Sequence, residues 1–150
     1  MVGIGYDSHR FATGRKLILG GVEVDHPQGL EGHSDADVVT HAVIDAILGA
    51  AGGGDIGTLF PPDEERWRDA ASIDLLRTAI GTIAGRVVNV DATVICEAPK
   101  LAPYKPQMEA LLGEVTSAKV SVKATTNEGM GWIGRGEGIA CIAVAQVEDD

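Results

Sequence analysis

The feature that most limits the fold is the segment GIACIAVAQV, residues 138–147, which is apolar at almost every position. A strand that is apolar on both faces belongs in the middle of a sheet or at an interface. Residues 87–96 and 119–125 show the alternation of apolar and polar residues that is typical of strands. We therefore expect a β-sheet in which residues 138–147 are central or lie at an interface.

Helical periodicity is clearest in residues 34–51, where apolar side chains recur every three or four positions. Ser34, followed by Asp37 three residues later, is typical of a capping box, so we expect this helix to begin at Ser34. A second helix is predicted from Ser72 and a third from about Pro103. The apolar face of the first helix consists of Val39, Ala42, Val43, Ala46, Ile47 and Ala50.

Strands and helices together indicate the fold class. Residues 2–6 and 16–24 are rich in β-forming residues and predict two strands near the N-terminus. Strands interrupted by helices indicate an α/β domain of the α+β type, with a mixed β-sheet and helices mainly on one face. The length suits a single compact domain, residues 1–150. Residues 52–67, rich in Gly and Pro, predict a loop with a functional role.

The charge balance argues against one class of partner. The chain has 12 basic and 22 acidic residues, a net charge of −10, and its basic residues form no cluster. We therefore expect no nucleic acid partner. The same charge repels a phosphorylated substrate, so metal ions, backbone N–H groups and a few placed cations would have to offset the repulsion.

No segment of the chain reads as a signal or a membrane span. Polar residues occur from Asp7 onward, and nowhere are 18 consecutive residues apolar. Cys96 and Cys141 lie in apolar alternating segments without C-x-x-C spacing, so we expect buried, reduced thiols. These observations predict a cytoplasmic protein with no membrane partner.

Two groups of residues could bind a metal. Asp7 and His9 lie two positions apart on an extended segment, which points both side chains to the same side. The alternative is a hydrogen-bonded pair at the end of a strand. His41 lies on the predicted helix, in a polar ridge opposite its apolar face. In that ridge Asp37 or Asp45 could accept a hydrogen bond from the second nitrogen of His41.

The simpler interpretation of this ridge is a helix surface that only caps itself. Its composition instead favours a surface that binds a metal or transfers protons. It contains short acceptors and a histidine in place of the Lys, Glu and Gln of most solvated faces: Ser34, Asp37, His41 and Asp45. Asp7, His9 and His41 form a set of three nitrogen and oxygen ligands. This is the number typical of a catalytic zinc that keeps one position open.

Three further segments could contact a substrate. His33 and Ser34 precede the helix, whose N-terminal N–H groups could receive an oxyanion, although a histidine there can also be a solvated turn residue. Asp55, Gly57 and Asp63 could bind sugar hydroxyls or a second cation, or be exposed turn residues. The Gly-rich segment near the C-terminus suits phosphate oxygens, with Lys123, Thr125, Thr126, Glu128 and Arg135. It contains no Walker A pattern.

Five segments, in this order, resemble the signature blocks of the 2-C-methyl-D-erythritol 2,4-cyclodiphosphate synthase family. They are GYDSHRF, GHSDADVVTHAVIDAILGA, GDIGTLFP, APK and KATTNEGMGWIGRGEGIA, and the match covers nearly the whole chain. The resemblance implies that the 2-phosphate of 4-diphosphocytidyl-2-C-methyl-D-erythritol 2-phosphate attacks the β-phosphorus and releases CMP. The activity would be that of a phosphorus–oxygen lyase in non-mevalonate isoprenoid biosynthesis.

The resemblance also implies roles for individual residues. Asp7, His9 and His41 match the zinc ligands, and Glu128 matches a ligand of a second divalent ion, Mg²⁺ or Mn²⁺. His33 and Thr126 match positions that stabilise the transition state. The remaining substrate contacts would be Ser34, Asp55, Ile56, Gly57, Phe60, Asp63 and Glu64 for the erythritol, and Ala98, Pro99, Lys100, Leu101 and Thr125 for the cytidine. Pro62 departs from the family, in which many members have an acidic residue there.

Members of the family are homotrimers with active sites between neighbouring subunits. Their apolar central cavity can hold an isoprenoid diphosphate, and Trp132 and Arg135 occupy matching positions. Two other functions use the same residues. A zinc-dependent phosphohydrolase would activate water at the open metal position. A trimeric module could instead bind prenyl diphosphates without turnover.

Overall fold

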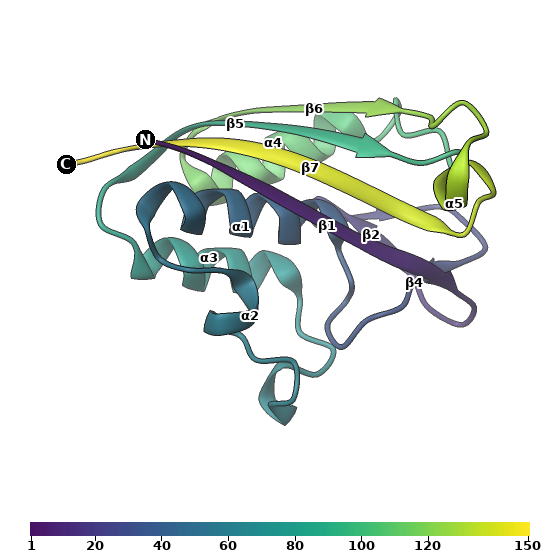
Figure 1. Cartoon of the computed structure of the whole chain (residues 1–150), viewed down its shortest axis with the longest axis horizontal. Helices are drawn as coiled ribbons and strands as arrows, with labels where there is room; N and C mark the ends of the chain where they lie inside the picture. Colours follow the sequence, from purple (N-terminus) through teal and green to yellow (C-terminus); the bar gives the residue numbers. More distant parts are fainter.

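The computed structural model describes residues 1–150 and contains a five-stranded mixed sheet (Figure 1). Its strands, in spatial order, are β4 (Gly29–Leu30), β1 (Val2–Ala12), β7 (Gly138–Glu148), β5 (Arg86–Ile95) and β6 (Lys119–Thr125). β7 is antiparallel to both β1 and β5, whereas β6 runs parallel to β5. The predicted central position of the last strand is confirmed.

The helices cover one face of this sheet, as expected (Figure 1). α1 (Val38–Ala51) lies against β1 and β7, and α4 (Lys105–Thr116) lies against β6. α3 (Ser72–Thr82) packs on α1 and α4 and forms an outer layer. The short helix α5 (Gly131–Gly134) precedes β7. Apolar side chains between the sheet and the helices form one continuous core. No helix is long and apolar enough to cross a membrane.

Two glycines allow β1 and α1 to approach closely. A Cβ atom on Gly3 would lie 2.0 Å from the carbonyl oxygen of Ala46, and one on Gly5 would lie 1.9 Å from that of Ala42. Side chains alternate along a strand, so the residues that follow Gly5 on the same face are Asp7 and then His9. The approach of the two backbones therefore brings this face of β1 beside the N-terminal half of α1.

The N-terminal strands differ from the prediction. β1 continues to Ala12, so Asp7 and His9 lie inside a strand and not at its end. Residues 16–24 form a small hairpin of two strands, β2 (Leu17–Leu19) and β3 (Val22–Val24). The chain reverses at Gly20 and Gly21, whose φ angles are +58° and +76°. Consecutive positive φ angles are typical of a tight hairpin turn and favour glycine.

The predicted start of the first helix is wrong by four residues. α1 begins at Val38, and its N-cap is Asp37, whose carboxylate accepts a hydrogen bond from the backbone N–H of Thr40. Ser34 therefore lies before the helix. α3 begins at Ser72 as predicted, and α4 begins at Lys105, two residues after Pro103. The loop predicted for residues 52–67 contains two short helices, α2 (Ile56–Leu59) and η1 (Glu65–Trp67).

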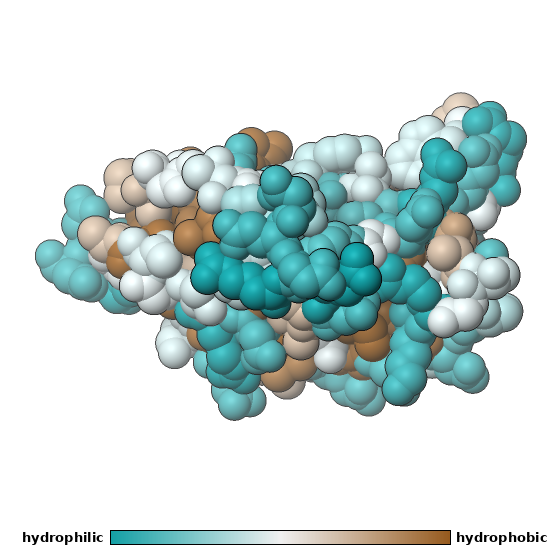
Figure 2. Space-filling model, turned by 90° about the horizontal axis from the view of Figure 1, so that it is seen from below, coloured by the Kyte–Doolittle hydropathy of each residue, from teal (hydrophilic) through white to brown (hydrophobic).

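The face of the sheet that the helices leave uncovered is apolar around β1 and β7. Ile4 lies opposite Val144, and Tyr6 lies opposite Ile142, in the antiparallel pairing of these strands. Together with Val2 all of these side chains are exposed, Ile4 by 70%. By contrast, the side of the molecule formed by α2 and α3 is mainly hydrophilic, and its apolar areas are separated from one another (Figure 2). The uncovered face is thus a contiguous exposed apolar surface, of the kind that marks an interaction site.

The close contact of β1 and α1 gives a prediction for stability. Gly5→Ala should lower the free energy of unfolding by about 3 kcal/mol, because the added methyl group meets the backbone of α1. The matched control is Gly81→Ala on α3, where no atom lies within 4 Å of the added carbon. This control should stabilise by about 0.5–1 kcal/mol, because alanine favours a helix. Urea unfolding measures both, and equal midpoints for Gly5→Ala and the wild type would refute the contact.

Candidate metal centre and substrate pockets

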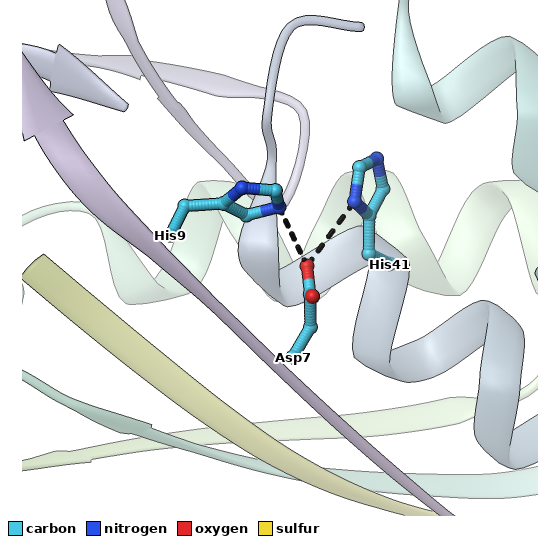
Figure 3. Close-up of side chains that lie close together, drawn as sticks. All are labelled: Asp7, His9 and His41. Carbon is cyan, nitrogen blue, oxygen red and sulfur yellow. Dashed lines mark hydrogen bonds and ion pairs between the residues drawn. The ribbon is translucent and has the colours of Figure 1, made fainter. Parts of the chain in front are cut away.

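Asp7, His9 and His41 meet at one point between β1 and α1. Figure 3 shows both imidazole rings turned toward a single carboxylate oxygen of Asp7. Nε2 of His9 lies 2.9 Å from Oδ2 of Asp7, and Nδ1 of His41 lies 3.2 Å from the same oxygen. One ligand atom from each residue lies within 4.8 Å of the other two. The structure thus brings together the three residues predicted to bind a metal.

The environment of His9 indicates that this cluster suits a cation. Nδ1 of His9 donates a hydrogen bond to the carbonyl oxygen of Glu31 over 2.8 Å. A neutral ring then carries a lone pair on Nε2, which is buried and has no hydrogen-bond partner, although it faces the Asp7 carboxylate. Two lone pairs facing each other are unfavourable unless a positive charge lies between them. A divalent metal would supply that charge.

Burial and mutual contacts shift the pKa values of Asp7 and His9. Burial by itself raises the pKa of the Asp7 carboxyl, but hydrogen bonds and positive charge from His41 and His9 outweigh burial and lower its pKa to about 2. Burial lowers the pKa of His9, and its contact with Asp7 outweighs that effect, so the pKa of His9 is raised. The Asp7 carboxylate therefore favours the protonated form of His9.

The second nitrogen of His41 contacts hydroxyl groups and no carboxylate. Its Nε2 lies 2.8 Å from Oγ of Ser72 and 3.1 Å from Oγ of Ser34. The expectation that Asp37 or Asp45 accepts from His41 is wrong, because backbone N–H groups occupy both carboxylates. Asp37 accepts from Gly20, Gly21 and Thr40, and Asp45 accepts from Ile56. Burial raises the pKa of both of these carboxyl groups.

The same N-cap changes the expected oxyanion site at the start of α1. The carboxylate of Asp37 already occupies the N-terminal end of this helix, where we expected an anion to bind beside His33 and Ser34. His33 and Ser34 instead line a pocket of about 200 Å³ beside His9. The pocket is lined by His9, His33, Ser34, Ile56, Gly57, Phe60, Pro62, Trp67 and Leu75.

The acidic residues of the loop differ in their surroundings. Asp55 is the N-cap of α2 and accepts from the side chain and the backbone N–H of Thr58, which lower the pKa of its exposed carboxyl. Glu64 accepts from the side chains of Arg66 and Trp67. Asp63 is exposed, and neither it nor Glu64 lines the pocket beside His9.

The residues expected to bind a nucleotide lie around a second pocket, of about 250 Å³, at the end of β5 and β6. It is lined by Cys96, Glu97, Pro99, Lys100, Leu101, Ala102, Lys105, Ala124, Thr125 and Thr126. Ala98 precedes Pro99 through a cis peptide bond. Glu128 follows this pocket in an exposed turn. Trp132 lines another cavity near the start of β7, and Arg135 pairs with Glu137 over 2.6 Å.

Within one chain the two pockets are separate. The register of the sheet pairs Asp7 with Cys141, and Cys141 with Val94. Val94 in turn pairs with Ala124 on β6. Three strand spacings of about 4.8 Å place the metal ligands about 14 Å from the row that begins the second pocket. Glu128 and Thr126 therefore do not join Asp7 within the same chain.

Three residues near the sites make contacts that the sequence analysis did not predict. Arg15 donates to the carbonyl oxygens of Gly32 and Ser34 and so holds the segment that carries His33. Glu97 accepts from the backbone N–H groups of Asn127 and Gly129, which flank Glu128. Ser72 contacts His41. The sequence indicated these contacts only through the position of the three residues beside the predicted segments, because each contact joins residues that are far apart in sequence.

Burial explains the state of the two cysteines. Cys96 and Cys141 are both free and buried, as predicted. Burial raises the pKa of the Cys96 thiol to about 11, with a smaller contribution from the charge of Glu97, and it raises that of Cys141 further. Neither thiol is a ligand in the cluster around Asp7.

Known proteins are similar to this chain over nearly its whole length. A model described as the YgbB family matches residues 1–148. The chain is 55% identical over 153 residues to 2-C-methyl-D-erythritol 2,4-cyclodiphosphate synthase of Symbiobacterium thermophilum, with 98% of each chain covered. It is 56% identical over 148 residues to the bifunctional enzyme IspD/IspF of Granulibacter bethesdensis, with 95% of this chain and 39% of that enzyme covered.

Solved structures with the same fold include complexes with CDP. The bifunctional IspDF from Campylobacter jejuni superposes with a TM-score of 0.91 at 38% identity, over 99% of this chain and 42% of that chain. A CDP complex of IspF from Plasmodium falciparum gives a TM-score of 0.83 at 33% identity, over 99% and 96% of the two chains. These are similarities of fold and sequence over nearly the full length.

The pKa of Asp7 gives a prediction for the metal-free protein. Its folded-state value of about 2 lies below the ordinary value of 3.8. The resulting stabilisation, about 2 kcal/mol, is therefore complete above about pH 4 and is lost as the pH falls from about 4 toward 2. Carboxyl carbon NMR should show a titration midpoint near 2 for Asp7. Urea unfolding of the wild type should show a steeper loss of stability over this interval than unfolding of Asp7→Asn. A midpoint near 3.8 would refute the assignment.

Proposed function

Because the chain belongs to the YgbB family, we infer that it is an enzyme that forms 2-C-methyl-D-erythritol 2,4-cyclodiphosphate, the product in its relatives' name. The substrate would be 4-diphosphocytidyl-2-C-methyl-D-erythritol 2-phosphate, with CMP as the second product. The reaction breaks the bond between the α–β bridging oxygen and the β-phosphorus, and it forms a bond from the 2-phosphate to the same phosphorus. The observation that carries this function is the assembled cluster of Asp7, His9 and His41 in a chain that matches the family from end to end.

We propose that Asp7, His9 and His41 hold a zinc ion. Two imidazoles and one carboxylate are the nitrogen and oxygen ligands that zinc accepts, and three protein ligands leave one position for a substrate oxygen. Bound there, zinc would supply the positive charge that polarises a phosphate. The partnerless Nε2 of His9 beside the Asp7 carboxylate supports this assignment.

The chain's own residues would orient the substrate around this centre. The pocket beside His9 suits the methylerythritol part, with apolar walls from Ile56 and Phe60 and polar groups from His33 and Ser34. The free oxygen of Asp55 lies at the start of α2 and could accept from a sugar hydroxyl. Holding the 2-phosphate and the β-phosphorus together makes the attack effectively unimolecular, which is the main contribution that positioning can make.

The second pocket suits the cytidine diphosphate part. Lys100 could offset phosphate charge, and Thr125 and Thr126 offer hydroxyl groups at its edge. Relatives of this fold have been solved with CDP bound. We propose that Glu128 is a ligand of a second divalent ion, Mg²⁺ or Mn²⁺, which would keep water and phosphate oxygens as its other ligands.

We propose that the chain assembles as a homotrimer whose active sites lie between subunits. Within one chain the metal ligands lie about 14 Å from the strand row at which the second pocket begins, yet a single substrate has to contact both. The exposed apolar face of β1 and β7, around Ile4 and Ile142, supplies a surface for self-association. Three such faces would enclose an apolar cavity near Trp132 and Arg135, suited to an isoprenoid diphosphate.

Neither alternative function is favoured. A zinc-dependent phosphohydrolase would use the same three ligands, but the relatives that match the whole chain are named as cyclodiphosphate synthases. A binding module without turnover would not need a cluster whose half-buried ligand atoms converge on one point. Both alternatives remain outcomes of the following assay.

The assay uses purified protein with the proposed substrate, zinc and magnesium, followed by phosphorus NMR. The wild type should produce the cyclic diphosphate together with CMP. His41→Ala should lower the rate at least about 100-fold, because one of three metal ligands is lost. The matched control is His26→Ala, whose ring packs on Phe11 outside the cluster and should keep the wild-type rate. Linear products would indicate a hydrolase, and unchanged substrate would indicate a binding module.

Mixed assemblies test the shared site. His41→Ala and Glu128→Gln should each be inactive alone, and their co-expression should restore activity. In a random mixture half of the metal centres are intact, and half of these face an intact neighbour, so about a quarter of the wild-type rate is expected. The matched control is co-expression of His41→Ala with Asp7→Asn. Both substitutions remove a metal ligand, so every metal centre stays incomplete and no activity should be restored. Equal, negligible rates in both mixtures would contradict a site between subunits.

A further inference from the structure

One contact of the metal cluster has no role so far. Ser72, the first residue of α3, is fully buried, and its hydroxyl lies 2.8 Å from Nε2 of His41. The same hydroxyl donates a hydrogen bond to Oδ1 of Asp35, and the backbone N–H of Ser72 donates to Oδ2 of Asp35 over 3.0 Å. Asp35 thus holds both the backbone and the side chain of Ser72.

The direction of these hydrogen bonds follows from the groups involved. An ionised carboxylate only accepts, so the single proton of the Ser72 hydroxyl points to Asp35. The hydroxyl oxygen is then left with lone pairs toward His41, and Nε2 of His41 has to be the donor. In a neutral imidazole with its proton on Nε2, the lone pair is on Nδ1. Nδ1 is the nitrogen that faces Asp7.

We propose that Ser72, fixed by Asp35, is a positioning residue that holds His41 in the tautomer needed to bind a metal through Nδ1. This inference rests on the proposed metal centre. Outer groups that accept the second N–H of a metal-binding histidine fix its tautomer and ring orientation. His9 has the complementary arrangement, because the carbonyl oxygen of Glu31 holds its proton on Nδ1 and leaves Nε2 for the metal.

Ser34 also touches Nε2 of His41 but is less suited to this role. Its oxygen lies 3.1 Å from Nε2 and accepts from the backbone N–H of Ala36 over 3.2 Å. No acceptor holds the proton of the Ser34 hydroxyl, so this group can rotate. It also lines the pocket assigned to the substrate. The orientation of Ser72, by contrast, is set by Asp35.

The contact also joins the loop of the substrate pocket to the metal ligand. The backbone N–H of Asp69 donates to the carbonyl oxygen of His33, and that of Asp35 donates to the carbonyl oxygen of Ala70. Ser72 follows two residues after Ala70, so the loop's C-terminal end is attached to the segment before α1 at three successive places. Ser72, which contacts His41 from the C-terminal end of this loop, is therefore held in place by the protein itself and does not depend on bound substrate.

The test measures zinc binding and histidine spectra on the full-length protein. Zinc affinity of the metal-free protein is determined by competition with a chromophoric chelator. Ser72→Ala should weaken it about 10–100-fold, as is typical for loss of such a support. Ser72→Thr keeps the hydroxyl and should stay within about threefold of the wild type. Thr82→Ala is the matched control, because its hydroxyl donates to Ala79 within α3, and it should leave zinc affinity unchanged.

A spectroscopic measurement separates positioning from a general loss of structure. Ring-labelled ¹⁵N histidine in the zinc-loaded wild type should show His41 with a protonated, slowly exchanging Nε2–H. In Ser72→Ala this N–H signal should exchange rapidly with water or disappear, while the corresponding Nδ1–H signal of His9 persists. Far-ultraviolet circular dichroism confirms that each variant is folded.

Two results would overturn the proposal: wild-type zinc affinity with an unchanged His41 signal in Ser72→Ala, or a loss in Ser72→Thr as large as in Ser72→Ala. The second result would show that packing, and not the hydroxyl, matters. These outcomes are independent of the cyclisation assay. A wild type that binds zinc without forming the cyclic diphosphate would refute the proposed function and leave the role of Ser72 intact.

Discussion

The structure depends on the close approach of β1 and α1. Glycines at positions 3 and 5 let the strand backbone lie against the helix backbone without intervening side chains. Only at this separation can Asp7 and His9, which follow Gly5 on the same face, meet His41 on the helix. The candidate metal centre thus continues the packing interface of β1 and α1, which is apolar near the glycines and polar at Asp7, His9 and His41. Figure 3 shows the three polar side chains that meet in this last part.

Local periodicity accounts for what the sequence could predict. The apolar character of residues 138–147 predicted a strand at the centre of the sheet or at an interface, and β7 is central; helical spacing located α1, α3 and α4. Alternation along a strand put Asp7 and His9 on one side, and the polar ridge of α1 identified His41. These properties depend on neighbours within a few residues, so they can be read without knowing the tertiary structure.

Contacts between distant segments account for what the sequence could not show. Ser72 and Asp35 are 37 positions apart, and Glu97 holds a turn 30 residues later. No spacing rule connects such pairs, because the packing of whole elements brings them together. The start of α1 was misjudged for the same reason: Asp37 rather than Ser34 caps the helix because the hairpin turn at Gly20 and Gly21 also donates to its carboxylate.

The acidic residues around the sites explain how a chain with a net charge of −10 can receive a diphosphate. Backbone N–H groups bind the carboxylates of Asp37, Asp45 and Glu97, and Asp35 is bound by the N–H and the hydroxyl of Ser72. Each of these charges is partly neutralised by donors that stay in place. Asp7 is the exception, because its partners are histidines, whose ring nitrogens can release protons to solvent and bind a metal instead. The carboxylate of the candidate metal centre is thus the one whose partners a cation could replace, and a cation bound there would attract the phosphate.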